Sequence, residues 1–190
     1  LQNPLDQGAD IVLHSATKYL GGHSDVVHGA LIMNDAGLEE RLRFIQNSCG
    51  AVPGPHDAWL VLRGIKTLHV RMQRHCENGA TIAKWLRAHP KVDKVFWCGF
   101  EDHPNHEIAK KQMKDFGGMM SFYLKGGAKE ASQFLSAVKL FTLAESLGGV
   151  ESLIGHPASM THGSIPLEER KKTGVVDSLI RLSIGIVDVE

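Results

Sequence analysis

A lysine near the start of the chain lies among residues that could bind an aldehyde and a phosphate group. Lys18 follows an apolar run at 9–13, has Ser15 and Thr17 beside it, and is followed shortly by the pair Gly21–Gly22. A lysine forms a Schiff base once its amine is deprotonated, which desolvation among apolar neighbours favours. Small hydroxyls donate hydrogen bonds to phosphate oxygens, and glycines let the backbone approach a ligand closely. A plain turn that carries a solvated lysine fits the same residue types, so both interpretations stay open at this point.

The element that must position this lysine is a strand. Residues 9–13 form a short β-branched run after Gly8, which predicts a buried strand. Open α/β sheets bind ligands at the carboxyl ends of their strands, and Lys18 comes just after such an end.

An arginine occurs within an apolar run near the other end of the chain. Arg181 lies in residues 179–184, which predict a strand built for burial. Because a guanidinium keeps its charge, a buried arginine requires an anion, ideally a carboxylate bound by both prongs. The anion could be a ligand or an acid of the protein, and the arginine could also take an outward-facing strand position.

Two polar residues lie where another predicted strand ends. Glu145 and Ser146 precede the turn at Gly148–Gly149, so their side chains could leave the sheet edge and face a cleft. A capping or turn pair is the alternative interpretation.

The residues around the lysine resemble those of a known enzyme family. The sequence Ser-Ala-Thr-Lys-Tyr-Leu-Gly-Gly-His-Ser-Asp at 15–25 is similar to the cofactor segment of the cystathionine γ-synthase/γ-lyase family, the pyridoxal phosphate (PLP) enzymes of cysteine and methionine metabolism. Similarity continues through residues 41–48, 62–68, 141–149, 157–162 and 179–185. The resemblance implies an α/β, PLP-dependent transferase-like architecture of fold type I.

The resemblance also implies roles for individual residues. Lys18 would hold pyridoxal 5′-phosphate covalently and shuttle protons, with Ser15 and Thr17 binding the cofactor. The substrate would be contacted by Glu145, Ser146, Thr161 and Arg181, of which Arg181 would bind the α-carboxylate. A buried hydroxyl bonded to backbone is the plainer interpretation of Thr161.

Two domains follow from the same resemblance. Residues 1–68 would be the C-terminal part of a PLP-binding domain with a mostly parallel sheet, and its N-terminal half would be absent. Residues 69–190 would be a C-terminal α+β domain whose last helix is truncated. The chain thus looks like the C-terminal half of a family member, and Tyr19 is not assigned a catalytic role because the stacking tyrosine would come from the missing half.

The expected activity is that of a cystathionine γ-lyase, which converts L-cystathionine to cysteine, 2-oxobutanoate and ammonia. The alternative is a cystathionine γ-synthase, which joins cysteine to an activated homoserine. Residues 46–53 are closer to lyases, whereas residues 154–156 are closer to synthases. A non-catalytic fragment is a third possibility, of another class.

The remaining pattern alternates strands and helices. Strands are expected at 26–33, 92–97, 119–124, 140–143 and 178–184, and helices at 38–47, 106–114 and 128–138. One long or kinked helix over 57–89, with candidate bends at Gly64 and Gly79, would lead into the second domain.

The amino-acid composition limits which partners and which cellular compartment we expect for the protein. The chain has 190 residues, 43% hydrophobic, and balances 21 acids against 21 bases, so neither nucleic acid nor membrane is an expected partner. Three cysteines without CxxC spacing predict a reducing, cytoplasmic location, and residues 103–106 predict a loop rather than a metal site. The expected partners are a small amino-acid substrate and, from the resemblance, copies of the chain in a homotetramer built from dimers.

Overall fold

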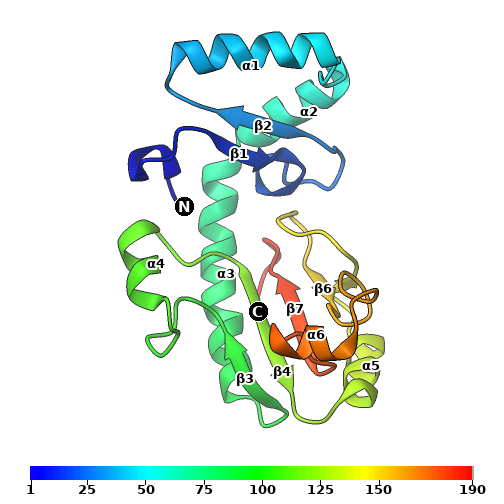
Figure 1. The fold of residues 1–190 in the computed structure, drawn as a ribbon. Coiled ribbons are helices and arrows are strands. Elements are labelled where there is room, and N and C mark those ends of the chain that lie inside the picture. Colours follow the sequence, from blue (N-terminus) through cyan, green and yellow to red (C-terminus); the bar gives the residue numbers. More distant parts are fainter. Residues whose placement is uncertain (190) are drawn as a thin grey trace. The chain divides into compact units, whose positions relative to one another are not determined.

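The computed structural model describes residues 1–189, and Glu190 lies outside the described residues. The chain divides into two compact units: residues 2–69 form the N-terminal unit, and residues 70–189 with Leu1 form the C-terminal unit. Figure 1 shows the helices and strands of each. That residues 1–68 belong to a cofactor-binding domain, and that a last helix is truncated, stay predictions.

The N-terminal unit contains strands, short helical turns and helices. In chain order they are the 3-10 turn η1 (Pro4–Gln7), β1 (Val12–Ser15), the π-helical turn η2 (Ala16–Leu20), β2 (Gly29–Ile32), α1 (Ala36–Cys49) and α2 (Pro55–Ile65). β1 and β2 pair antiparallel, a detail of the sheet that the sequence did not predict. The reason lies in their connection, which has no crossover helix to return the chain in the same direction.

Helix α1 begins earlier than its apolar spacing predicts because of a polar cap. The Leu38 N–H donates to Asp35 Oδ1 at 2.7 Å, which satisfies one of the unpaired amides of the first turn. The helix ends at Gly50, whose φ of +68° closes the last turn in the left-handed region that favours glycine.

The long helix predicted over residues 57–89 is two helices, α2 and α3 (Leu68–Ala88). The chain breaks just after Gly64, where the Thr67 hydroxyl donates to the Gly64 carbonyl at 3.2 Å and competes with the helical ladder. Gly79, the other candidate bend, lies inside α3. Because Gly79 has no side chain, α3 packs closely against the backbone at Gly117: a Cβ on Gly79 would lie 2.5 Å from Gly117 O.

The C-terminal unit contains a five-stranded sheet and most of α3. After α3 come β3 (Val92–Phe96), α4 (His106–Gln112), β4 (Met119–Leu124), α5 (Ala128–Ala137), β5 (Thr142–Leu143), β6 (Leu153–Gly155), α6 (Leu167–Lys172) and β7 (Leu179–Ser183). The strand order is β3-β4-β7-β6-β5, in which β5 and β6 are parallel and the other pairs antiparallel. Sequence spacing did not predict β6 and α6, because each is too short to establish a period.

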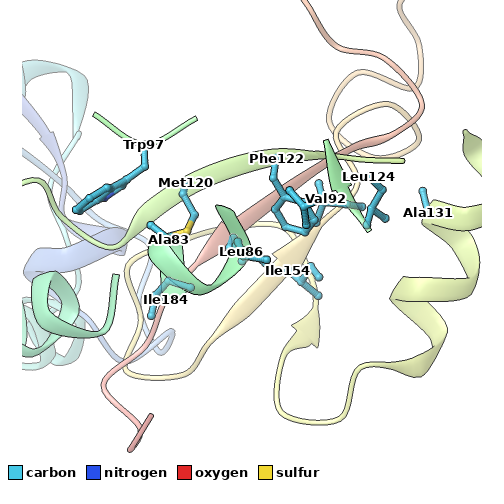
Figure 2. Close-up of a cluster of buried hydrophobic side chains, with 12 residues drawn as sticks. Ala83, Leu86, Val92, Trp97, Met120, Phe122, Leu124, Ala131, Ile154 and Ile184 are labelled. Atoms are coloured by element: carbon cyan, nitrogen blue, oxygen red, sulfur yellow. The ribbon is translucent and has the colours of Figure 1, made fainter. Parts of the chain in front are cut away.

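The core of this unit lies on one face of the sheet (Figure 2). Along β4, Met120, Phe122 and Leu124 are buried while the residues between them are more accessible, the alternation of a strand with one covered face. These side chains pack with Ala83 and Leu86 of α3 in one apolar cluster. The cluster also includes Ala131 of α5, so α3 and α5 cover this face of the sheet. The opposite face is left for other contacts.

On β7 the same alternation decides where Arg181 lies. Ile180 and Leu182 belong to the core cluster, so Arg181 between them is on the opposite face and only half-buried. An arginine at this position is set apart from the apolar core while its backbone is held in the middle of the sheet.

Buried polar side chains of α3 hold the segment that follows β7. Asn78 Nδ2 donates to Gly185 O at 3.0 Å and to Val187 O at 2.7 Å, and His75 Nδ1 contacts Ile184 O at 2.6 Å. Burial lowers the pKa of His75, so its ring is neutral at neutral pH. These contacts anchor the C-terminal side of the strand that carries Arg181.

No helix within residues 1–189 has both the length and the apolar character required to cross a lipid bilayer.

We expect Asn78→Ala to destabilise the protein by about 2 kcal/mol, because it leaves two backbone carbonyls without their donor. Urea unfolding of the variant and the wild type measures the difference. Asn105→Ala is the matched control, since Asn105 is exposed and its side chain makes no capping hydrogen bond to α4, and it should change stability by less than about 0.5 kcal/mol. Equal stabilities of the Asn78→Ala variant and the control would contradict the anchoring role.

Candidate active site

Lys18 lies on a turn that backbone hydrogen bonds hold in an uncommon conformation. The turn η2 follows β1 directly, and the N–H groups of Gly21 and Gly22 donate to Ala16 O and Lys18 O at 2.8 and 2.7 Å. Lys18 itself has φ −88° and ψ −131°, outside the helical region. The residue is half-buried, so it is held in a defined backbone conformation while its side chain remains partly accessible.

The two hydroxyls beside the lysine have different surroundings. Thr17 Oγ1 accepts a hydrogen bond from His28 N–H at 3.0 Å, and Thr17 N–H donates to His28 O at 3.2 Å. Thr17 therefore ties the turn to the segment that leads into β2. Ser15 is exposed and does not cap the turn, so its hydroxyl can reach a ligand. Binding of a phosphate group by either residue stays a prediction.

Helix α2 packs against the lysine turn η2 at a glycine, without a side chain between the two backbones. A Cβ on Gly64 would lie 2.9 Å from Leu20 O and closer still to Gly21 O, so only glycine permits this approach. The small core of Ala16, Val26 and Val61 packs beside it. The position of the lysine turn is thus fixed by the backbone of α2.

Arg181 is the centre of a second group of predicted residues, within the C-terminal unit. Its register partner on β6 is Gly155, and its Nη2 donates to Ser146 O at 2.9 Å. A Cβ on Gly155 would lie 3.9 Å from that same nitrogen, an ordinary van der Waals distance, so the two positions are direct neighbours. Among residues 1–189, Arg181 forms no salt bridge with an acid. Its charge is therefore available to an anion from outside the described chain.

Ser146 carries backbone strain where it meets the arginine. Its φ of +86° is in a region that residues other than glycine rarely adopt, at a cost of about 1–3 kcal/mol. The carbonyl of this same residue receives the hydrogen bond from Arg181. Such strain persists when the surroundings determine the conformation, and it occurs often at functional sites.

The predicted substrate residues Glu145, Thr161 and Arg181 line one small pocket. Its lining is Ala144, Glu145, Gly155, His156, Pro157, Met160, Thr161 and Arg181. The enclosed space is about 10 Å³, room for roughly one water molecule, so these residues form a wall of a site and not a complete substrate cavity. Ser146 joins the group through its carbonyl.

Thr161 is exposed, and its Oγ1 lies 2.8 Å from His162 Nδ1. The plainer interpretation of a buried hydroxyl bonded to backbone is therefore wrong, although the substrate-orienting role stays a prediction.

The sequence reasoning did not assign His156 and Gly155 to this site. Both depend on β6, which was not predicted. The sequence drew attention to residues 154–156 through their similarity to synthases, and a histidine between glycine and proline follows the apolar pair Leu153–Ile154.

Comparison with known proteins places the chain among enzymes of one group. The model of the family described as "Cys/Met metabolism PLP-dependent enzyme" matches residues 1–190. The chain is 57% identical over 188 residues to a cystathionine gamma-lyase of Dictyostelium discoideum, covering 99% of this chain and 49% of the relative. It is 56% identical over 187 residues to a cystathionine beta-lyase of Coxiella burnetii, covering 98% and 48%.

A solved structure gives the same result for the fold. The crystal structure of cystathionine gamma synthase from Xanthomonas oryzae pv. oryzae, in complex with aminoacrylate and cysteine, matches with a TM-score of 0.95 and 52% identity. The match covers 99% of this chain and 49% of that one. The chain spans about half the length of the relatives that it matches.

These similarities define the class of protein first: an α/β fold of the PLP-dependent transferase type, fold type I, as the sequence predicted. The chain belongs to the Cys/Met metabolism family of PLP-dependent enzymes. Pyridoxal phosphate is the cofactor of that family, which also confirms the predicted cofactor.

The lysine turn fits this cofactor chemically. A partly accessible amine on a fixed turn and the exposed Ser15 hydroxyl form a donor set that suits an aldehyde with an anionic group. When bound, pyridoxal phosphate supplies an electron sink for reactions at the carbons of an amino acid. Lys18 would hold it, with Ser15 the better placed of the two hydroxyls.

We expect Gly64→Ala to displace the lysine turn, because the added methyl group would collide with the carbonyls of Leu20 and Gly21. The variant should lose about 1–3 kcal/mol of stability and attach less cofactor at Lys18, measured by urea unfolding and by borohydride trapping. Gly29→Ala is the control in the same unit, since its nearest neighbour, His14 O, would be 3.8 Å away. Equal cofactor attachment in the two variants would contradict this account.

Proposed function

We propose that the protein is a PLP-dependent cystathionine γ-lyase, which with water converts L-cystathionine to cysteine, 2-oxobutanoate and ammonia. The observation that carries the proposal is the Arg181 site. A half-buried guanidinium that pairs with no acid of residues 1–189 has its charge available for a carboxylate. Every amino-acid substrate of this family's chemistry offers one.

Arg181 would bind the substrate α-carboxylate through the prongs of its guanidinium. The hydrogen bond from Nη2 to Ser146 O fixes the plane of the group before the substrate arrives. A fixed, planar fork loses little freedom when it forms two parallel hydrogen bonds with a carboxylate.

Glu145 supports cystathionine as the substrate. It lines the pocket with Arg181 but does not pair with it, and a carboxylate there would attract an ammonium group of the substrate. Cystathionine has two amino-acid ends, so one substrate could satisfy both the guanidinium and the carboxylate.

Lys18 would supply the proton transfers. Its Nζ, released from the cofactor when the substrate binds, would accept the proton of the substrate α-carbon and return it so that the γ-substituent can leave. The wall around Arg181 would hold the substrate while these transfers take place.

A cystathionine γ-synthase is the alternative, and it has equal support. The names of similar proteins include gamma-lyases, a beta-lyase and gamma synthases, and the solved structure with a TM-score of 0.95 is a synthase. The same Lys18 and Arg181 would serve both reactions, which differ in outcome: the lyase releases a product that water hydrolyses to 2-oxobutanoate and ammonia, whereas the synthase forms a new bond from the γ-carbon to the cysteine thiol.

We also propose a cytoplasmic homotetramer built from dimers. The three cysteines are free thiols, which suits a reducing compartment. The N-terminal unit exposes large apolar side chains, including Leu13, Val27 and Phe44 at 74, 90 and 72%, which is the kind of surface that assembly covers. Analytical ultracentrifugation of the complete protein tests the tetramer.

Cofactor attachment separates an enzyme from a non-catalytic fragment. Borohydride reduction of the complete protein with pyridoxal phosphate, followed by peptide mapping, should find the adduct on Lys18. Lys18→Ala should abolish it, and Lys66→Ala, at an exposed lysine of the same unit, should not. An adduct at another lysine, or none on the complete protein, would refute the catalytic proposal.

Product analysis separates the two activities. With L-cystathionine, a γ-lyase should release 2-oxobutanoate, and Lys18→Ala should release none. With an activated homoserine and cysteine, a γ-synthase should form cystathionine instead. Formation of cystathionine without release of 2-oxobutanoate would show that the protein is a synthase and would contradict the lyase proposal.

A further inference from the structure

His156 occupies a position next to the Arg181 site that the proposed reaction does not use. Strand β6 ends at Gly155, the register partner of Arg181, and His156 is the next residue. It is half-buried and lines the same pocket as Arg181, Met160 and Thr161.

The ring of His156 joins two segments that flank the arginine. Its Nε2 lies 2.8 Å from Asp177 O, and because a carbonyl only accepts, Nε2 carries the hydrogen. In the neutral ring, Nδ1 then accepts from the Ser159 hydroxyl at 2.7 Å. Ser159 belongs to the turn after β6, whereas Asp177 lies just before β7, so one side chain links both.

The backbone of His156 organises the turn that reaches the pocket. Its carbonyl accepts from the N–H groups of Ser159 and Met160 at 3.2 and 3.0 Å, and its own N–H lies 3.3 Å from Met160 Sδ. Met160 and Thr161, which follow in this turn, contribute side chains to the pocket wall. Their placement therefore depends on where His156 is held.

An ion pair holds Asp177, whose carbonyl binds the His156 ring, in place. Its carboxylate pairs with Arg170 Nη1 at 3.2 Å, and the Arg170 side chain is only 12% exposed. A pair with one partner so well shielded is less weakened by solvent than a surface pair. The carbonyl that receives the His156 hydrogen bond is thus part of an anchored segment.

We propose that His156 is a positioning residue for the Arg181 site. Its two ring hydrogen bonds hold the turn with Met160 and Thr161 against the segment that leads into β7, and so set the wall against which the substrate carboxylate binds. This inference rests on the proposed function, since it assigns a role in binding the same substrate.

The kinetic test compares variants of the complete, PLP-loaded protein. His156→Leu removes both ring hydrogen bonds and should raise the substrate KM about 10-fold, with a much smaller change in kcat. His156→Gln keeps a donor for Asp177 O and should recover most of the loss. Arg181→Lys shows the effect of changing the residue that contacts the substrate carboxylate directly, and it should raise KM more than His156→Leu does.

His106→Leu is the matched control for a purely structural role. His106 is a buried histidine of the same unit whose Nδ1 lies 2.9 Å from Cys98 O, and it does not line the pocket. The variant should lower the melting temperature while leaving KM unchanged. An unchanged KM in His156→Leu, or an equal rise in His106→Leu, would overturn the proposal.

A second readout needs no turnover and separates this proposal from the proposed function. Phenylglyoxal labels arginine, and peptide mapping follows its rate at Arg181. His156→Leu should be labelled several-fold faster than the wild type, because the wall beside the guanidinium is no longer held, and His106→Leu should match the wild type. Equal rates at Arg181 in all three proteins would overturn the role of His156 even if the protein is a lyase, whereas a missing adduct at Lys18 would affect only the function.

Discussion

The permanent charge of Arg181 is the constraint on which the C-terminal unit depends. A guanidinium cannot be deprotonated to suit its surroundings, so a strand that carries it must keep it off the apolar face. The alternation of β7 does so, because Ile180 and Leu182 enter the core while Arg181 faces the other way. The carbonyl of the strained Ser146 then orients the charge without neutralising it.

The lysine turn solves a different problem by different means. An amine that is to react must be reachable, so it cannot be fixed by dense side-chain packing. Here the backbone fixes it: η2 closes with bonds to Ala16 O and Lys18 O, and α2 approaches at Gly64 with no side chain between them. The N-terminal unit has only a small buried cluster, and the turn is the part of the unit that the cluster supports.

The sequence predicted well what depends on local pattern and on similarity. The strand of Arg181, strand β4 and the fold class were predicted because apolar alternation and long matching segments carry them. The antiparallel pairing of β1 with β2 was not predicted, because pairing direction depends on the connection between strands and not on their residues. His156 was missed because its partners, Ser159 and Asp177, meet only when the three-residue strand β6 and β7 are placed side by side.

A side chain that acts through hydrogen bonds suits the link beside Arg181. An anion site loses affinity when a second anion lies near it, and a charged link would bring either a competing carboxylate or a competing cation. Histidine joins Ser159 to Asp177 through directional hydrogen bonds that require no net charge. The carboxylate of Asp177 meanwhile pairs with Arg170, and its carbonyl binds the ring. The link thus holds the wall beside Arg181 without placing a further carboxylate next to the guanidinium.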